Sequence, residues 1–248
     1  MRVRLAMLTA GAGLAALLCM PLPALAQPGL GAAASYAVLG GSTITNRGAT
    51  TIRGDVGVSP GLAITGLPFG QPSRGSVHAG DVVAARAQAD VATVYRFLED
   101  MHCTTTMCSE ELGGRLLSPG VYGFSGGARM IGALELDARG DTAAVFVFQI
   151  ANALTVAAGA SVTLSNGAQA RHVWWQVGSS ATLGSSSVMS GNVLARTSIT
   201  LKANAGLAGQ ALAQCGAVTM DTNSIVSSVD RVTATSRTTW GRIKSLYR

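Results

Sequence analysis

Serine catalysis is the first chemistry to consider in this chain, because residues 57–61 (GVSPG) match the G-x-S-x-G pattern of hydrolase nucleophiles. In those enzymes the serine stands on a sharp turn that leads directly into a helix. Here a proline and a glycine follow Ser59, and residues 60–66 are poorly suited to a helix. The chain has three histidines, but no spacing in the sequence pairs one of them with this serine. The pattern therefore does not favour a hydrolase.

Carboxylates are the next candidates, because polysaccharide-cleaving enzymes use acidic residues clustered on one face. Of the twelve acidic residues, half fall in one helical segment or in the loops beside it. Elsewhere Glu135, Asp137 and Asp141 form the densest group, and the two aspartates are of the type expected in turns. A glycan-active enzyme stays a minor alternative.

Two cysteines, Cys103 and Cys108, flank a short polar segment. A disulfide between them is the natural interpretation for a protein in an oxidising compartment. A zinc site that includes His102 is the alternative, but it lacks a fourth ligand. Cys215 is expected to be a buried free thiol. The sequence thus predicts no metal and no cofactor.

The elements that could position these residues begin after a targeting segment. Residues 1–26 combine two early arginines, an apolar run and a cleavage site of small residues that ends at Ala26. We therefore predict secretion, extracellular or periplasmic, with a mature domain at 27–229 and a basic tail at 230–248. The tail could cap the domain or contact the cell envelope or extracellular matrix.

The composition argues against several classes of protein. Charged residues make up only 12% of the chain and aromatic residues 5%, while the formal net charge is +6. Nucleic-acid binding is not expected, because the arginines are scattered rather than gathered on a basic face with interleaved aromatics. Glycine together with frequent β-branched residues instead suits short strands joined by tight turns.

One segment, at about residues 81–101, predicts a helix. It contains no glycine or proline, and Val83, Ala87, Val91, Val94 and Leu98 recur at helical spacing. Asp81 is of the right type to cap its start. We therefore expect one long amphipathic helix whose apolar stripe packs on the rest of the domain.

A repeat of short strands fills most of the remaining sequence. Thr182, Thr200 and Thr219 are 18 and 19 residues apart, each between two mostly apolar neighbours. Thr155 precedes Thr182 by 27 residues, which implies an insertion or an extra side in that coil. Such a period is typical of a solenoid. Because side chains alternate along a strand, we expect these four threonines to form one exposed column.

Several segments in order resemble the microbial ice-binding protein family. They are YAVLGGSTITN at 36–46, GDVGVSPG at 54–61, LLSPGVY at 116–122, AVFVFQI at 144–150, WWQVG at 174–178 and GNVLA at 191–195. The resemblance covers roughly residues 33–228. It implies a mainly β fold, a three-faced right-handed β-helix in which the N-terminal strands join the C-terminal coils and one long α-helix packs alongside.

The resemblance also implies a function without catalysis, in which one flat face adsorbs to ice. The repeats in that family often have the form Thr-Ala/Gly-x-Thr/Asn. Here the matching tetrads end in threonine throughout, at Thr155, Thr182, Thr200 and Thr219, while their first positions are Asn152, Ser179, Thr197 and Gly216. Glu135 is expected to bring a charge to the continuation of the threonine column.

The sequence therefore predicts a secreted, monomeric antifreeze protein that binds ice or ordered water and inhibits ice growth or recrystallisation. A secreted structural or adhesive solenoid with little ice affinity is the alternative. The predicted ice-binding residues are Thr155, Thr182, Thr200, Thr219, Ser180, Ser198, Ala217, Thr43, Thr45 and Thr51.

Overall fold

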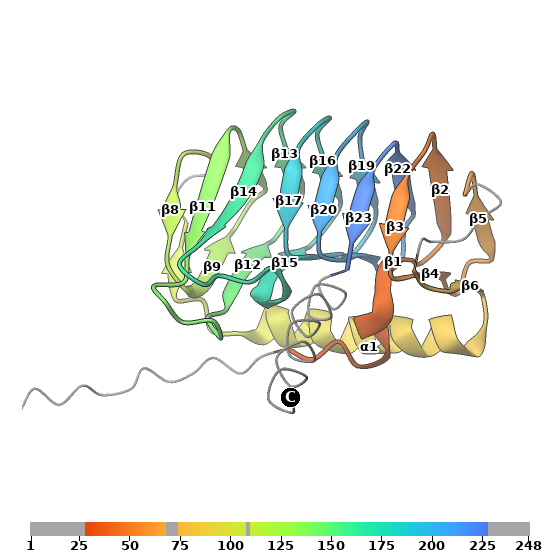
Figure 1. Ribbon diagram of the computed structural model, residues 1–248. Coiled ribbons are helices and arrows are strands. Elements are labelled where there is room, and N and C mark those ends of the chain that lie inside the picture. Colours follow the sequence, from red (N-terminus) through yellow and green to blue (C-terminus); the bar gives the residue numbers. More distant parts are fainter. Residues whose placement is uncertain (1–27, 68–73, 108–109, 228–248) are drawn as a thin grey trace, which may run out of the picture.

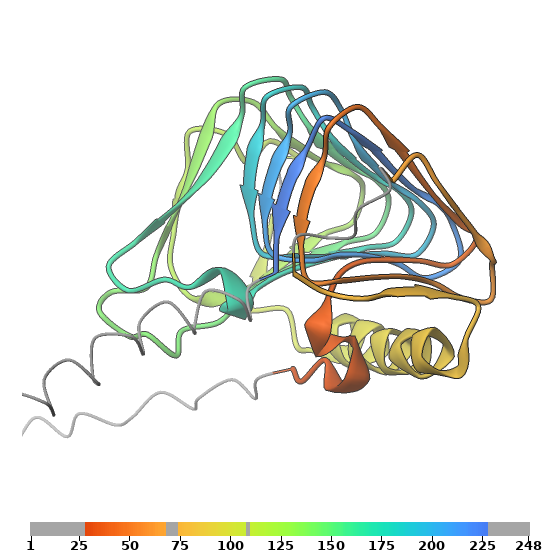
Figure 2. The ribbon, with the colours of Figure 1, turned by 45° about the vertical axis from the view of Figure 1, so that its right-hand side comes forward.

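The computed structural model describes residues 28–67, 74–107 and 110–227. Most of these residues form a solenoid of three parallel sheets that is triangular in section, with one helix along one side (Figure 1, Figure 2). The predicted β-solenoid with a long flanking helix is therefore confirmed. The predicted signal segment and basic tail lie outside the described residues. No helix in the described ranges is long and apolar enough to cross a membrane.

Each coil passes through the three sheets in turn. Sheet A contains, in spatial order, β6 (Val77–Ala79), β4 (Asp55–Val58), β1 (Tyr36–Gly40), β21 (Ala211–Ala213), β18 (Asn192–Ala195), β15 (Val173–Val177), β12 (Phe146–Ile150), β9 (Gly120–Phe124) and β7 (Thr105–Thr106). Sheet B contains β10 (Ala128–Met130), β13 (Leu154–Val156), β16 (Ala181–Leu183), β19 (Ile199–Leu201), β22 (Val218–Asp221), β2 (Thr43–Arg47) and β5 (Ala63–Thr65). Sheet C contains β3 (Thr51–Arg53), β23 (Ser224–Val226), β20 (Gly206–Ala208), β17 (Val188–Ser190), β14 (Ser161–Ser165), β11 (Ala133–Asp137) and β8 (Leu116–Leu117).

The order of the coils is discontinuous, as the family resemblance implies. The first three strands, β1, β2 and β3, pair with β21, β22 and β23 of the last C-terminal coil. The strands β4, β5 and β6 then extend the stack beyond them. The chain next returns along the solenoid as a helix to the opposite end (Figure 1). Segments far apart in sequence therefore share each sheet.

Alternation along each strand separates the core from the surface. In β13, Leu154 and Val156 are buried inside the solenoid while Thr155 is exposed. The interior is apolar along its whole length and includes a stack in which the rings of Phe148 and Trp175 lie 4.0 Å apart. Since each coil is too thin to bury these side chains alone, the stacking of coils stabilises the fold.

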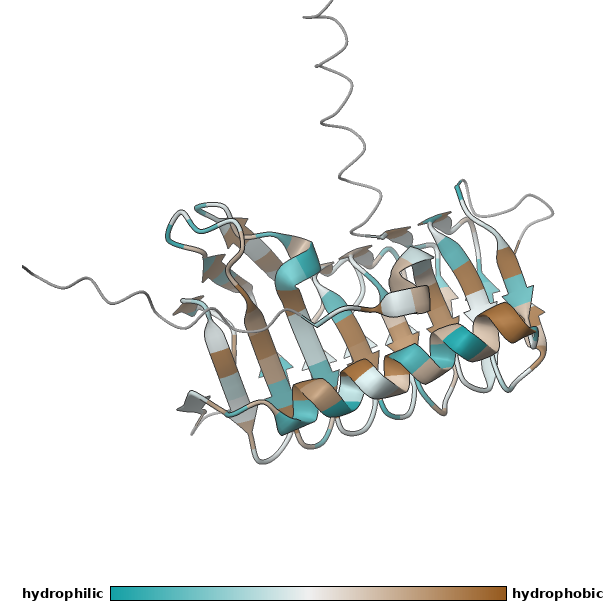
Figure 3. Cartoon of the chain, turned by 90° about the horizontal axis from the view of Figure 1, so that it is seen from below, coloured by the Kyte–Doolittle hydropathy of each residue, from teal (hydrophilic) through white to brown (hydrophobic). Residues whose placement is uncertain are grey.

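The helix α1 (Val82–Asp100) covers the outside of sheet A, as Figure 3 shows from below. Its first turn is capped as predicted, because Asp81 Oδ1 accepts a hydrogen bond of 2.8 Å from the Ala84 N–H. Ala87, Val91 and Leu98 are buried against sheet A, whereas Val83 is exposed, contrary to the predicted stripe. At the other end, Gln149 Nε2 donates to the carbonyls of Leu98 and Met101, which would otherwise lack partners.

Corners between sheets B and C are built from residues with positive φ, one in each coil. These are Gly132, Gly159, Ser186, Asn204, Thr222, Gly48 and Gly66. All but Gly66 turn the backbone sharply enough for a short strand of sheet C to follow a short strand of sheet B. The 27-residue step between Thr155 and Thr182 does not add a fourth side to the coil. It reflects an insertion between β14 and β15 that includes the 3-10 helix at Ala170–His172.

Candidate functional site

A continuous column of threonines runs along the outside of sheet B. The strand register pairs Thr155 with Thr182, Thr182 with Thr200, and Thr200 with Thr219. The four threonines predicted to form one column therefore do so. Thr219 pairs in turn with Thr45, and Thr45 with Thr65, so six consecutive strands contribute one threonine each. Successive strands of a sheet lie about 4.7–4.9 Å apart, which sets the spacing of the column.

The column is exposed over a fixed support. Thr155 and Thr65 are exposed and the four threonines between them are partly exposed. The residues that precede them are inward and mostly buried: Leu154, Ala181, Ile199, Val218, Ile44 and Ile64. The β-branched threonine side chain has few rotamers, and every strand of the column except β5 is paired on both sides, so the hydroxyls and methyls keep a regular arrangement.

A second row of small residues runs beside the threonine column, two residues earlier in each coil. It consists of Ala153, Ser180, Ser198, Ala217, Thr43 and Ala63. The predicted Ser180, Ser198, Ala217 and Thr43 all belong to it. Within the row Ser198 Oγ accepts a hydrogen bond of 3.2 Å from the Ala217 N–H. Strand geometry places the two rows about 6.5–7 Å apart. We call the column and this row together the sheet B face.

Two sequence predictions about this face need correction. Thr51 lies in β3 of sheet C, paired with Ser224, because the chain has already turned the corner at Gly48. Glu135 also lies in sheet C, opposite Thr163, and does not continue the threonine column. Arg129 of β10 is the residue in register with Thr155. Thr65, by contrast, was not predicted, although it follows the same alternation of apolar and polar residues in β5.

The first positions of the predicted tetrads lie in turns rather than in strands. Asn152, Ser179, Thr197 and Gly216 precede the strands of sheet B at its corner with sheet A. The Thr197 Oγ1 atom lies 3.3 Å from Ser180 Oγ, which links the turn to the second row. Variation at these positions therefore changes the rim and leaves the threonine column intact.

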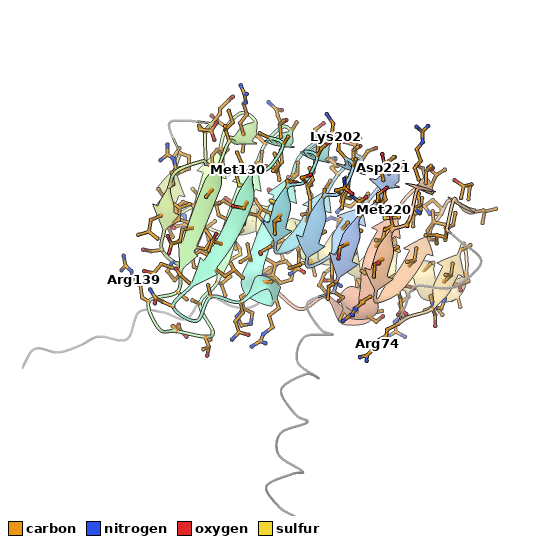
Figure 4. The ribbon with its side chains drawn as sticks, turned by 45° about the horizontal axis from the view of Figure 1, so that its top comes forward. Arg74, Met130, Arg139, Lys202, Met220 and Asp221 are labelled. Carbon is orange, nitrogen blue, oxygen red and sulfur yellow. The ribbon has the colours of Figure 1, made fainter. Side chains whose placement is uncertain are left out.

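Charged residues border the face along its corner with sheet C. Arg47 is in register with Asp221, and Lys202 follows β19 in the neighbouring coil. Figure 4 shows Lys202 and Asp221 at the ends of these adjoining strands. Each of these charged residues comes two positions after a threonine of the column. After β13 and β16, toward the other end of the sheet, that position is taken by the uncharged Ala157 and Gly184. The uncharged part of the face is thus widest around Thr155 and Thr182.

The cysteines do not contribute to this face as a bonded pair. Cys103 is a free cysteine in the structure, with its Sγ 3.7 Å from the carbonyl oxygen of Val121, so the predicted disulfide is not formed there. Its predicted partner, Cys108, lies outside the described residues. Cys215 is a free cysteine as expected, but it is exposed rather than buried because it lies in the turn before β22.

The described residues offer little that could carry catalysis. Ser59 is buried and strand β5 rather than a helix follows it, which agrees with the argument against a hydrolase. Among residues 28–67, 74–107 and 110–227 no cluster of three His, Cys, Asp or Glu could hold a metal ion. Tyr36 is buried near Asp55 and Asp81, and burial raises its pKa to about 12. His78 Nδ1 lies 2.7 Å from Asp81 Oδ2 at the start of α1, which is a helix cap rather than a catalytic group.

Comparisons with known proteins agree with this arrangement. The family model described as ice-binding-like matches residues 38–226. An ice-binding protein from Nostoc sp. is 47% identical over 199 residues, which cover 79% of this chain and 72% of that protein. The crystal structure of an ice-binding protein from the Antarctic ascomycete Antarctomyces psychrotrophicus is 38% identical with a TM-score of 0.78, and the match covers 81% of this chain and 98% of that one. An ice-binding protein from an Antarctic biological consortium is 39% identical with a TM-score of 0.80, over 86% of this chain and 96% of that one.

Proposed function

The chain belongs to the ice-binding-like family, a non-enzymatic family, and from this we propose that it adsorbs to ice through the sheet B face. We further propose that the protein is exported by residues 1–26, acts as a monomer, and inhibits ice growth or recrystallisation. The observation that carries the proposal is the column of six threonines in register on consecutive strands of sheet B. No other outer row among the described strands repeats one residue type in this way.

The physical argument rests on adding many small contacts. A single hydroxyl gains little on a surface of ice, because liquid water offers it equally good hydrogen bonds. An array of hydroxyls and methyls with a fixed spacing can hold a layer of water in a matching pattern, so the contacts add along the column. Little conformational entropy is lost on adsorption, because these side chains and the strands beneath them are already ordered.

The other two sheets are less suitable for the same role. The outer side of sheet A is covered by α1, and its outward residues Leu39, Val147 and Leu212 are buried against the helix. Sheet C is open to solvent but mixes side chains of different size and charge, among them Glu135 and Val188. Only sheet B combines an open surface with a regular one.

A structural or adhesive solenoid with little ice affinity is the second candidate. The charges at Arg47, Asp221 and Lys202 favour it, because strongly hydrated groups at the margin of the face oppose the ordering of water in a lattice. The two functions differ in what they require of the threonine column. Adhesion through another surface does not depend on it.

Thermal hysteresis and recrystallisation assays on the mature domain test the proposal. Thr200→Tyr places a bulky ring in the middle of the column and should abolish most of the activity. Thr163→Tyr is a matched control, because Thr163 is an exposed threonine at the middle of a strand in sheet C. If the unmodified domain and Thr200→Tyr are equally inactive, the ice-binding assignment is wrong.

A further inference from the structure

The two ends of the threonine column differ. At one end Thr65 occupies the outermost strand, β5, and the column reaches the edge of sheet B unchanged. At the other end the outermost strand is β10, and Arg129 takes the position of the threonine. Beyond it, Glu111 forms an isolated bridge with Arg129. The column therefore runs as two charged residues followed by six threonines.

The backbone of β10, which carries Arg129, has the same strand geometry as the neighbouring strand β13 of the sheet B face. Ala128, Arg129 and Met130 pair one to one with the three residues of β13. Ala128 and Met130 point into the core and are buried, so the side chain of Arg129 points outward and is exposed. Gly127 precedes them in line with Ala153 of the second row. The geometry of the face thus continues onto β10, and only the side chain departs from it.

An arginine at this position prevents the regular pattern from continuing. Its guanidinium stands on a long flexible stem and carries a permanent charge with five N–H donors. It therefore extends past the level of a threonine side chain and orders water around a charge rather than around neutral hydroxyls and methyls. Within the described part of the chain, no hydrogen bond or ion pair holds the guanidinium of Arg129 down.

We infer that Arg129 sets the boundary of the ice-binding site: the bound water layer extends from β5 to β13 and stops at β10. This inference rests on the proposed function of the sheet B face and specifies how far along it the site reaches. The backbone of Arg129 is already paired on this side, since its N–H donates to the Glu110 carbonyl and its carbonyl accepts from the Leu112 N–H. The boundary therefore depends on the side chain of Arg129.

The inference predicts a gain of activity rather than a loss. Arg129→Thr should extend the column from six threonines to seven and lower the protein concentration that halves recrystallisation by roughly two- to fivefold. Arg53→Thr removes the same charge from an exposed strand position in sheet C and serves as the matched control. Its activity should equal that of the unmodified protein. Far-UV circular dichroism and size-exclusion chromatography should accompany both variants, to show that each stays folded and monomeric.

A second variant covers the case in which Arg129→Thr associates or fails to fold. Thr155→Arg moves the boundary inward by one strand and should reduce activity, since only five threonines remain uninterrupted. The inference is overturned if monomeric Arg129→Thr has the activity of the unmodified protein, or if Thr155→Arg does. With either of these outcomes Thr200→Tyr would still lack activity, because its ring interrupts the middle of the column. If the unmodified domain itself is inactive, the proposed function fails first, so the two failures are distinguishable.

Discussion

Sheets B and C are built on the same plan, yet their outer surfaces differ. Each has seven parallel strands whose inward side chains fill the common core. The row of sheet C that begins at Thr51 reads Thr51, Ser224, Gly206, Val188, Ser161 and Ala133 across successive strands. The corresponding row of sheet B is threonine six times.

This contrast separates what the fold requires from what it permits. Sheet C shows that a strand of this solenoid accepts glycine, valine, serine or glutamate at an outward position. Threonine is therefore not needed at these positions for the strands to pair or the core to pack. The repetition in sheet B needs another cause, and binding to a regular surface supplies one.

The largest expected effect tests the apolar core that sheets B and C share. Leu183→Ala in sheet B and Leu207→Ala in sheet C each remove a buried inward side chain. Each should lower the free energy of unfolding by about 2–5 kcal/mol, since both leave a cavity in the same core. Urea denaturation followed by circular dichroism measures this. A loss confined to one of the two variants would contradict a core shared by both sheets.

The next largest effect tests the outer surfaces, in which sheets B and C differ. Replacing Thr182 and Thr219 together by lysine should remove ice activity, because two charges then interrupt the column. Replacing Ser161 and Ser224 by lysine places the same charges on sheet C and should leave thermal hysteresis unchanged. Both double variants should stay folded, since exposed substitutions usually change the free energy of unfolding by less than about 0.5 kcal/mol each. Equal losses in the two variants would mean that charge alone, and not the face, controls activity.

A smaller effect concerns the corner that joins the two sheets. Thr222 has a φ of 55°, a left-handed conformation that is unfavourable for a β-branched residue. Thr222→Asn should raise the free energy of unfolding by about 1 kcal/mol, because asparagine adopts this conformation more easily. The position lies outside the sheet B face, so ice activity should not change. Chemical denaturation would refute the prediction if it showed the variant to be less stable.

The smallest effect concerns Asp81, which caps the helix that covers sheet A. The Ala84 N–H and the His78 side chain hold the pKa of Asp81 below its ordinary value. The ionised cap therefore stabilises the fold above the pKa of the unfolded carboxyl and loses this effect as the pH falls through the lower pKa of the folded state. In Asp81→Asn this part of the acid destabilisation should be absent. Melting temperatures between about pH 2 and 5 would show it as a flatter profile. An unchanged profile would mean that the cap contributes nothing measurable.

Local patterns in the sequence were enough to predict the helix, its cap and the outward direction of four threonines. Each of these depends on the spacing of residues that are close in sequence. Thr65 was missed, because its place in the column depends on β2 docking onto β22 and β5 docking onto β2. Residues 66–79 combine glycines, two prolines and little periodicity, which predicts a loop, yet Val77–Ala79 form β6 at the edge of sheet A.

The misplaced residues have the same origin. Thr51 and Glu135 follow a strand-like alternation that fits either sheet, and only the positions of the corners at Gly48 and Gly132 decide between them. Arg129 could have been found from the repeat itself, since it stands 26 residues before Thr155 between Ala128 and Met130, as Thr155 stands between two apolar residues. The stacking order of the coils is a long-range property that alternation does not encode.

The first strands to be synthesised depend on the last ones to complete their pairing. During translation β1 and β2 can pair early with β4 and β5, but their other edges have no strand to join until β21 and β22 have emerged, and β3 waits likewise for β23. A fragment that ends before β21 would present those strands as unpaired edges, which are prone to association. Four of the six threonines can align in a partly made chain, but Thr45 and Thr65 complete the array only when the two ends of the molecule close on each other. The full length of the array is therefore a sign that the whole domain has folded.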